Sequence, residues 1–327
     1  MKKSKKKPIL QKKISFTGLE LAEKLRKISI ENIANDKKKF NKNWPLINTE
    51  IKSRIGQKIE NVTGKKIFDL GDCYREIFMS LMPSDIKNKR EQKDLAIGGD
   101  GWERMVGWYL NLCLINTRAI VFKKKNEYFS KKILNAVTVD IKGNQIQSES
   151  DLVGMVIPEG LSFDIEEHHS EKKFLELFRE FTDDNYQNFE LCAIQCKTNF
   201  ADDVERPLLY QILYSLPRQL DIGIKIGIEG IHVNDFKNFK YSFVTVPTQK
   251  GERIPKPHSA PAIRSSLFTG GNYWGMPSQE GAAKSLKEFT NVNFFTVFKN
   301  GNSTIIDNLN ENIKNLKSKY KYFNLNY

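Results

Sequence analysis

Apolar residues in the first third of the chain recur about every 3.6 positions, a spacing typical of amphipathic helices. One helix is expected between Leu19 and Ile30, and shorter ones around residues 50–61 and 71–82. The clearest helix is predicted over residues 101–115, where the only charged residues are Glu103 and Arg104. A helix that is apolar on nearly every side is predicted to be buried. The glycine-rich residues 98–101 before it are expected to form a flexible loop.

Segments rich in β-branched residues follow this helix and alternate with helical patterns. Strands are predicted at residues 118–122, 133–141, 151–157, 190–197, 222–228, 241–246 and 293–298. Helices are predicted at residues 171–181 and 205–220, and a polar helix is predicted to close the chain. Strands that alternate with helices, behind a helical N-terminal part, indicate an α/β fold with a mixed β-sheet flanked by helices.

The composition also suggests how the chain is organised. Residues 1–13 are rich in Lys and contain no acid, so they are expected to form a basic flexible arm that either aids solubility or contacts phosphates. No linker rich in Ser, Gly or Pro interrupts the rest, which predicts one compact unit with appendages. We divide it into a helical N-terminal region (14–94), a core (95–300) with an acidic insertion (158–189), and a C-terminal helix (301–327).

The predicted strand at residues 190–197 carries the most informative polar residues. Because side chains alternate between the two faces of a strand, Gln195 and Lys197 share one face, and Cys192 and Cys196 point the other way. A lysine that ends an apolar strand beside an amide suggests a functional site. Taken alone, Lys197 is better explained as a side chain that reaches solvent at a strand end.

Asp151 opens another apolar strand. If the two strands pair in antiparallel fashion, the start of one lies beside the end of the other, and Asp151 approaches Gln195 and Lys197. Carboxylate, amide and backbone carbonyl oxygens are ligands that suit Mg²⁺. Two alternatives remain open: Asp151 is an ordinary turn residue, or the acid of the site is Asp164, which lies closer to Gln195 in the sequence.

Glu103 is the third candidate. A carboxylate on an apolar helix is unfavourable unless it is paired or binds a metal. Arg104 is a poor partner, because adjacent helix residues point about 100° apart. The alternative is that Glu103 only complements the dipole at the start of the helix.

The order of these residues resembles the PD-(D/E)XK nuclease superfamily, and in particular the type II restriction endonucleases. The resemblance rests on Glu103 on a helix, Asp151 at a strand start, and Gln195-Cys196-Lys197 at a strand end before a helix. It covers roughly residues 95–300, which would then be a nuclease core with a restriction-endonuclease-like fold.

The resemblance implies a role for each of these residues. Asp151, Glu103 and the backbone carbonyl of Cys196 would hold Mg²⁺, and Lys197 would orient or activate water. Gln195 would occupy the position that usually carries an acid, so this sequence has the Gln-x-Lys variant of the motif. The missing negative charge puts the affinity for metal and the number of metal ions in question.

The net charge of +13 favours a polyanionic partner such as nucleic acid. Residues 247–284 are predicted to form a DNA specificity loop, although a scaffold loop is an equal alternative. Basic, amide and aromatic side chains that could contact DNA occur there and on the preceding helix. They are Arg206, Gln211, Lys250, Arg253, Lys256, Arg264, Asn272, Tyr273 and Lys284.

The expected function is therefore that of a Mg²⁺-dependent type II restriction endonuclease, which hydrolyses double-stranded DNA at a specific sequence. By analogy, a homodimer is expected. Two alternatives are a repair or modification-dependent nuclease of the same superfamily, and a nucleic-acid-binding protein without catalysis.

The sequence has no phosphate-binding GxxxxGK[ST] motif for a nucleotide cofactor and no apolar run of membrane-spanning length. It also has no CxxC pair, so a cytoplasmic protein is expected.

Overall fold

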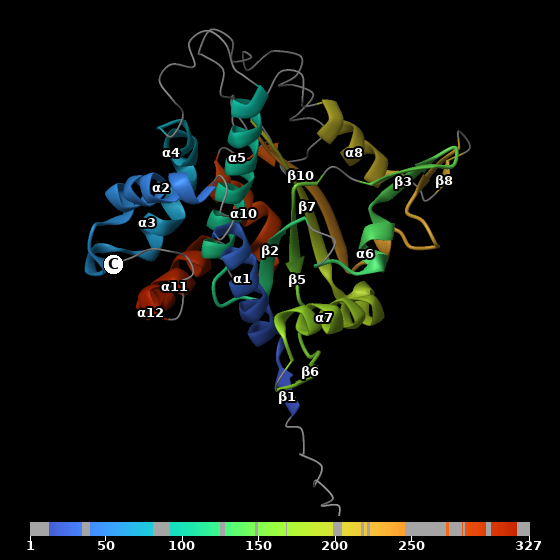
Figure 1. Ribbon diagram of the computed structural model, residues 1–327, viewed down its shortest axis with the longest axis horizontal. Coiled ribbons are helices and arrows are strands. Elements are labelled where there is room, and N and C mark those ends of the chain that lie inside the picture. The colour runs from blue at the N-terminus through green and yellow to red at the C-terminus, as the bar shows by residue number, and fades with distance from the viewer. Residues whose placement is uncertain are drawn as a thin grey trace, which may run out of the picture.

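The computed structural model has a central β-sheet with helices on both sides (Figure 1). It describes residues 13–34, 40–80, 92–124, 128–147, 150–167, 169–198, 205–216, 219–220, 223–245, 273–274, 283, 285–298 and 302–318. The predicted α/β class, with a mixed sheet behind a helical N-terminal part, is confirmed.

The central sheet has the strand order β11-β10-β7-β5-β2. The antiparallel part consists of three neighbours, β2, β5 and β7, and β10 runs parallel to β7. The short edge strand β11 runs parallel to β10. The bounds are β2 (Ala119–Lys123), β5 (Leu152–Val156), β7 (Glu190–Lys197), β10 (Asn238–Thr245) and β11 (Tyr273–Trp274).

The two faces of this sheet belong to two separate hydrophobic cores, as the alternation of side chains in β7 predicts. Leu191 and Ala193 lie in one core. Cys192, Ile194 and Cys196 lie in the other, together with residues of the buried helix α5. The helix α5 (Gln92–Cys113) therefore covers one face of the sheet and brings Glu103 near the strand ends.

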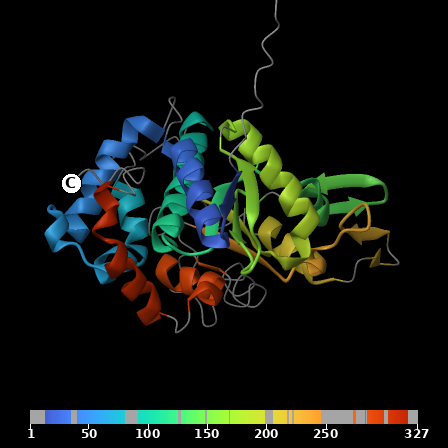
Figure 2. The same cartoon turned by 90° about the horizontal axis from the view of Figure 1, so that it is seen from below.

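The helices divide between these two faces (Figure 2). Most N-terminal and C-terminal helices pack with α5, and α6, α7 and α8 pack on the opposite face. The other helices are α1 (Gly18–Ala34), α2 (Phe40–Ile55), α3 (Gly64–Asp69), α4 (Tyr74–Ser80), α6 (Lys131–Ala136), α7 (Glu171–Asn185), α8 (Glu205–Ser215), α10 (Leu286–Phe294), α11 (Asn302–Asn312) and α12 (Asn315–Ser318). The 3₁₀ helices are η1 (Ile59–Asn61), η2 (Leu70–Asp72), η3 (Tyr186–Asn188), η4 (Val233–Asp235) and η6 (Phe295–Val297).

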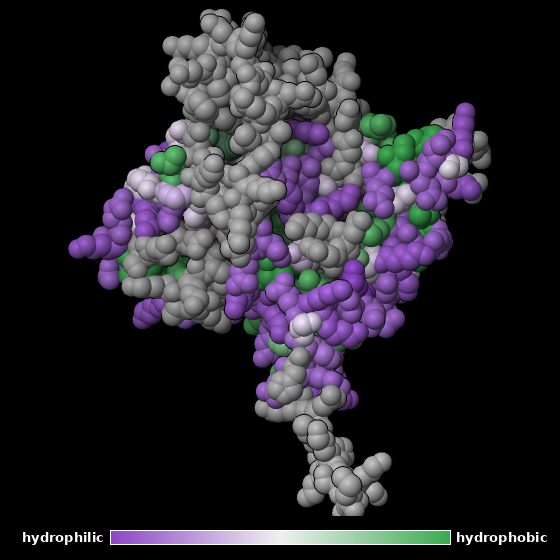
Figure 3. All heavy atoms as spheres, viewed as in Figure 1, coloured by the Kyte–Doolittle hydropathy of each residue, from purple (hydrophilic) through white to green (hydrophobic). Residues whose placement is uncertain are grey.

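Two smaller antiparallel sheets extend from the centre. One has the order β4-β3-β9-β8, and the other pairs β1 with β6. Their bounds are β1 (Lys13–Phe16), β3 (Thr138–Ile141), β4 (Asn144–Gln147), β6 (Phe163–Glu166), β8 (Gln219–Leu220) and β9 (Ile224–Ile226). Figure 3 shows hydrophobic surface over α8 and the four-stranded sheet, elements that carry the exposed Leu209, Ile212 and Ile146.

Several local predictions were wrong. Residues 219–220, predicted to belong to a helix, form the short strand β8. Residues 98–101 belong to α5, where Asp100 pairs with Arg104 one turn later. Residues 133–136 are helical, because Ser130 caps α6 and its oxygen accepts from the N–H of Ile133. Residues 293–298 end α10 and form η6, since apolar residues at helical spacing are buried there. The single closing helix is in fact α11 and α12, and residues 319–327 lie outside the described part.

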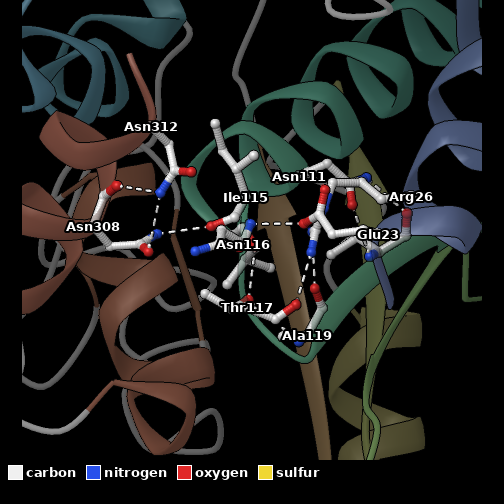
Figure 4. A network of polar contacts seen from close by, with 11 residues as sticks. Glu23, Arg26, Asn111, Ile115, Asn116, Thr117, Ala119, Asn308 and Asn312 are labelled. Atoms are coloured by element: carbon white, nitrogen blue, oxygen red, sulfur yellow. Dashed lines mark hydrogen bonds and ion pairs between the residues drawn. The ribbon is translucent and has the colours of Figure 1, made fainter. Parts of the chain in front are cut away.

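A buried polar network fixes the turn between α5 and β2 (Figure 4). Arg26 on α1 has no exposed surface, and its guanidinium donates to the carbonyl oxygens of Thr117 at 3.0 Å and Ala119 at 2.8 Å. It also donates to Glu23 at 3.1 Å, and the same Glu23 oxygen accepts from the N–H of Asn116 at 2.6 Å. This network holds the start of β2 against α1.

A second polar contact covers the outer edge of β2. The Asn111 side chain on α5 accepts from the N–H of Val121 at 3.1 Å and donates to the Val121 oxygen at 2.7 Å. The amide thus acts like one residue of a neighbouring strand, which satisfies backbone groups at a sheet edge. These hydrogen bonds therefore fix the position of α5, which carries Glu103, relative to β2, which carries Lys123.

Replacing Gly64 with alanine is expected to lower the free energy of unfolding by about 2 kcal/mol, because the added methyl group would overpack the contact between two helices. A Cβ atom at Gly64 would lie 2.4 Å from the backbone oxygen of Ile306 and 2.9 Å from the nitrogen of Asn310, so α3 and α11 must separate. Urea unfolding measures the effect. Gly99→Ala is the matched control, since a Cβ there meets no atom within 4 Å. Equal stability of Gly64→Ala and wild type would contradict this close packing.

Candidate functional site

Asp151 lies between two strands at the start of β5. Its carbonyl oxygen accepts from the N–H of Lys124 at 2.9 Å, and its own N–H donates to the Ile194 oxygen at 3.0 Å. Because Leu152 pairs with Ile194, Asp151 stands opposite Gln195 at the end of β7. The predicted antiparallel approach of Asp151 to the end of β7 is therefore confirmed.

The carboxyl group of Asp151 is held by the backbone of β7. Its Oδ2 atom accepts a hydrogen bond from the N–H of Cys196 at 2.6 Å. Burial and the negative charge of Glu103 raise the pKa of Asp151 to about 7. The Cys196 N–H and the ammonium groups of Lys197 and Lys123 act in the opposite direction. The charges of Glu103 and Lys197 therefore both act on the Asp151 carboxyl group, which lies at the start of β5.

Glu103 reaches this edge from α5, and its partner is Lys123. The Lys123 ammonium lies 3.1 Å from Glu103 Oε2 and also forms a short contact with Asp100. Arg104 pairs instead with Asp100, at 2.7 Å. The expectation that Arg104 is a poor partner for Glu103 is confirmed, and Glu103 does more than complement a helix dipole because it lies within α5, not at its start.

Sequence reasoning missed Lys123 and Asp100. Lys123 ends the apolar strand β2 just as Lys197 ends β7, and that parallel was the available signal. Asp100 could not be found in this way, because the glycine-rich residues around it predict a loop. Its contacts require α5 to extend back over residues 98–101.

Gln195 is fully buried, and its amide oxygen accepts a hydrogen bond from the hydroxyl of Tyr241 at 2.7 Å. Tyr241 lies on β10, and its ring packs against those of Tyr210 and Tyr214 on α8. One lone pair of the Gln195 oxygen is therefore used within the protein. This contact connects β7 to the aromatic residues of β10 and α8.

Asp164, the competing acid, lies outside the central sheet, on β6 of the two-stranded sheet. It is exposed on β6, where it pairs with Ser15 of β1. β6 follows the C-terminal end of β5, whereas Asp151 precedes its first residue; Figure 1 shows β6 beyond the lower end of β5. This placement favours Asp151 as the acid of the site.

Most of the residues expected to contact DNA cannot be placed. Arg206 and Gln211 lie on α8, but their side chains are outside the description. Tyr273 lies on the edge strand β11, paired with Phe243 of β10. The remaining candidates lie outside the described residues: Lys250, Arg253, Lys256, Arg264, Asn272 and Lys284. The same holds for most of the predicted specificity loop at residues 247–284.

The donors at this edge suit a hard cation. Among the described residues, no group of three or more His, Cys, Asp or Glu side chains is arranged to hold a metal ion. Mg²⁺, however, commonly binds through one or two carboxylates and keeps several waters. Asp151 and Glu103 supply two carboxylates whose mutual repulsion a cation would relieve. Burial raises the pKa of the Cys196 thiol well above its usual value, so Cys196 can contribute its backbone oxygen but no thiolate.

One property of the helices and two comparisons with known proteins bear on the kind of protein this is. Within the described residues, no helix is long and apolar enough to cross a membrane. No protein-family model matches the sequence. A search of curated proteins found no significant match.

Proposed function

We propose that this protein is a Mg²⁺-dependent endonuclease that hydrolyses phosphodiester bonds of double-stranded DNA. The observation that carries the proposal is the geometry of one end of the central sheet. Asp151 accepts a hydrogen bond from Cys196, next to Lys197 at the end of β7, and Glu103 pairs with Lys123 at the end of β2. Glu103, Asp151 and Lys197 arise from a helix (α5), the start of a strand (β5) and the end of a strand (β7) that is followed by another helix (α8). This is the order of elements on which the resemblance to PD-(D/E)XK nucleases rests.

In the proposed mechanism, Asp151, Glu103 and the Cys196 carbonyl would hold the metal ion. Bound Mg²⁺ would polarise the scissile phosphate and make a bound water more acidic. Lys197 orients the attacking water and stabilises the negative charge that builds on the phosphate oxygens. The water oxygen bonds to phosphorus and releases a proton to solvent, the bond between phosphorus and the leaving oxygen breaks, and the leaving oxygen takes up a proton from solvent. The Cys196 N–H keeps the Asp151 carboxylate oriented throughout.

Sequence specificity and a homodimer belong to the same proposal. A protein with a net charge of +13 is attracted to the phosphate backbone, whatever the base sequence. Base recognition would fall to α8 and residues 247–284, which carry the candidate reading residues named above. A homodimer would match a two-fold symmetric DNA site.

Incubation of the purified protein with phage DNA and Mg²⁺ tests the proposal. Discrete fragments that disappear when the metal is chelated are the expected result. Cleavage only of methylated, mismatched or branched DNA would select the repair or modification-dependent alternative. DNA binding without cleavage in Mg²⁺, Mn²⁺ or Co²⁺ would overturn the proposal in favour of a non-catalytic binding protein.

A further inference from the structure

Two strands of the central sheet end in lysine at the same edge. β2 and β7 both run antiparallel to β5, so they run in the same direction on either side of it. Lys123 is the last residue of β2 and Lys197 is the last residue of β7. By the alternation of side chains, Lys123 belongs to the sheet face covered by α5, and Lys197 to the opposite face. The two lysines therefore flank Asp151 from both sides.

The ammonium group of Lys123 is fixed by two acids of α5. It lies 3.1 Å from Glu103 Oε2 and forms a short ion pair with Asp100. Asp100 is itself held at 2.7 Å by Arg104. An ammonium group has three N–H donors, and these contacts use two of them. The third can serve a ligand that approaches from solvent, because a quarter of the Lys123 side chain (25%) is exposed.

DNA can bind at this edge of the sheet only if a cation there contacts its phosphates. Three carboxylates gather here, those of Asp100, Glu103 and Asp151, and all of them repel phosphate. Arg104 cannot offset this repulsion at the surface, since its side chain is only 6% exposed. Among the described residues at this edge, three lysines are partly exposed: Lys123, Lys124 and Lys197. Lys124 is the next residue after Lys123, so by alternation it belongs to the opposite sheet face, and Lys123 is the partly exposed lysine on the face of α5.

We propose that Lys123 is a second phosphate-binding lysine of the site, which contacts a backbone phosphate of DNA on the side of Asp151 opposite to Lys197. Asp100 and Glu103 position its ammonium group before DNA binds. The long side chain is thereby ordered in advance, which reduces the entropy lost on binding. This inference rests on the proposed action on DNA, but it concerns binding and can be tested without cleavage.

The test is the salt dependence of DNA binding by Lys123→Gln. Binding of a fluorescent duplex of mixed sequence is measured without divalent metal at salt concentrations from about 50 to 200 mM. Loss of one phosphate contact should reduce the slope of log K against log salt by about 0.9. Lys237→Gln is the matched control: Lys237 pairs with Glu190 at the other end of β7 and is 60% exposed. Its slope should equal that of wild type.

A double-mutant cycle separates a phosphate contact from a purely structural ion pair. Removing Lys123 also leaves Glu103 without its partner, and the exposed negative charge alone could weaken DNA binding. The slope is therefore compared between Glu103→Gln and the double variant Glu103→Gln/Lys123→Gln. A drop of about 0.9 in this background as well supports the contact. An unchanged slope in the double variant overturns it, as does an unchanged slope in Lys123→Gln.

Failure of this inference differs from failure of the proposed function. If wild type cleaves DNA but Lys123→Gln keeps the wild-type slope, Lys123 is not a phosphate contact and the nuclease proposal stands. If wild type never cleaves but the slope of log K against log salt is reduced by about 0.9 in Lys123→Gln, the contact stands and the nuclease proposal falls. Circular dichroism and thermal unfolding of each variant confirm that the comparison is made between folded proteins.

Discussion

Replacing Lys197 with alanine is expected to slow DNA cleavage by about a thousandfold, the scale seen when one preorganised donor is removed from a charged transition state. Lys197 is the last residue of β7, and its ammonium group acts on the Asp151 carboxyl. Loss of the side chain removes the group that orients water and stabilises the developing charge. Single-turnover cleavage of a defined DNA fragment in Mg²⁺ measures the rate of the chemical step.

Binding and folding should change much less than the rate. Lys197 lies at a strand end and is partly exposed, so the variant should unfold close to the wild-type temperature. The control variant Lys237→Ala should cleave at the wild-type rate, because Lys237 pairs with Glu190 at the opposite end of β7. If Lys197→Ala cleaves as fast as wild type, the assignment of the site is wrong, even though the protein is a nuclease.

Replacing Arg26 with methionine is expected to lower the free energy of unfolding by about 3 to 5 kcal/mol, the range for breaking a buried ionic network. Methionine fills a similar volume but leaves the Thr117 and Ala119 carbonyl oxygens without their donors. It also removes the cation beside Glu23, which lies 3.1 Å from the guanidinium. Chemical denaturation monitored by circular dichroism measures the change.

The neighbouring Lys27 provides the control for this substitution. Lys27 is on the same helix and its side chain is 59% exposed, so Lys27→Met should shift stability by less than about 0.5 kcal/mol. Arg26→Lys should fall in between, because an ammonium group cannot reproduce the fork that reaches two carbonyls. Wild-type stability of Arg26→Met would show that the network adds nothing to the attachment of β2 to α1.

Regular elements with a strong period could be predicted from the sequence. The strand Glu190–Lys197 has the predicted bounds, and its two faces divide between the two cores as the alternation requires. The buried helix α5 was also predicted, although it begins earlier than expected. Short segments such as residues 133–136 were assigned wrongly. The β-branched residues that follow, at 137–141, extended the predicted strand backwards, whereas the Ser130 cap and the burial of Ile133 favour a helix.

The candidate site was predictable only in part. Asp151 and the end of β7 meet as expected, because antiparallel pairing of two apolar strands fixes which ends are neighbours. The partners of Glu103 were not predictable. Lys123 faces Glu103 only because β2 lies next to β5 beneath α5. The order of strands in a sheet cannot be predicted from the local periodicity of the sequence. The Tyr241 hydroxyl meets Gln195 for the same reason, across the parallel pairing of β10 with β7.

The sequence by itself determined which residues form the strands around the site, which faces they share, and that an acid and a lysine end up at one sheet edge. These follow from periodicity and from the geometry of a single strand pair. The tertiary structure alone decided that Asp100, Arg104 and Lys123 join Glu103, that Arg26 is buried beneath the turn before β2, and that Asp164 is remote. Such contacts join side chains from elements distant in the sequence. They depend on strand order and helix placement, which the packing of the whole chain sets.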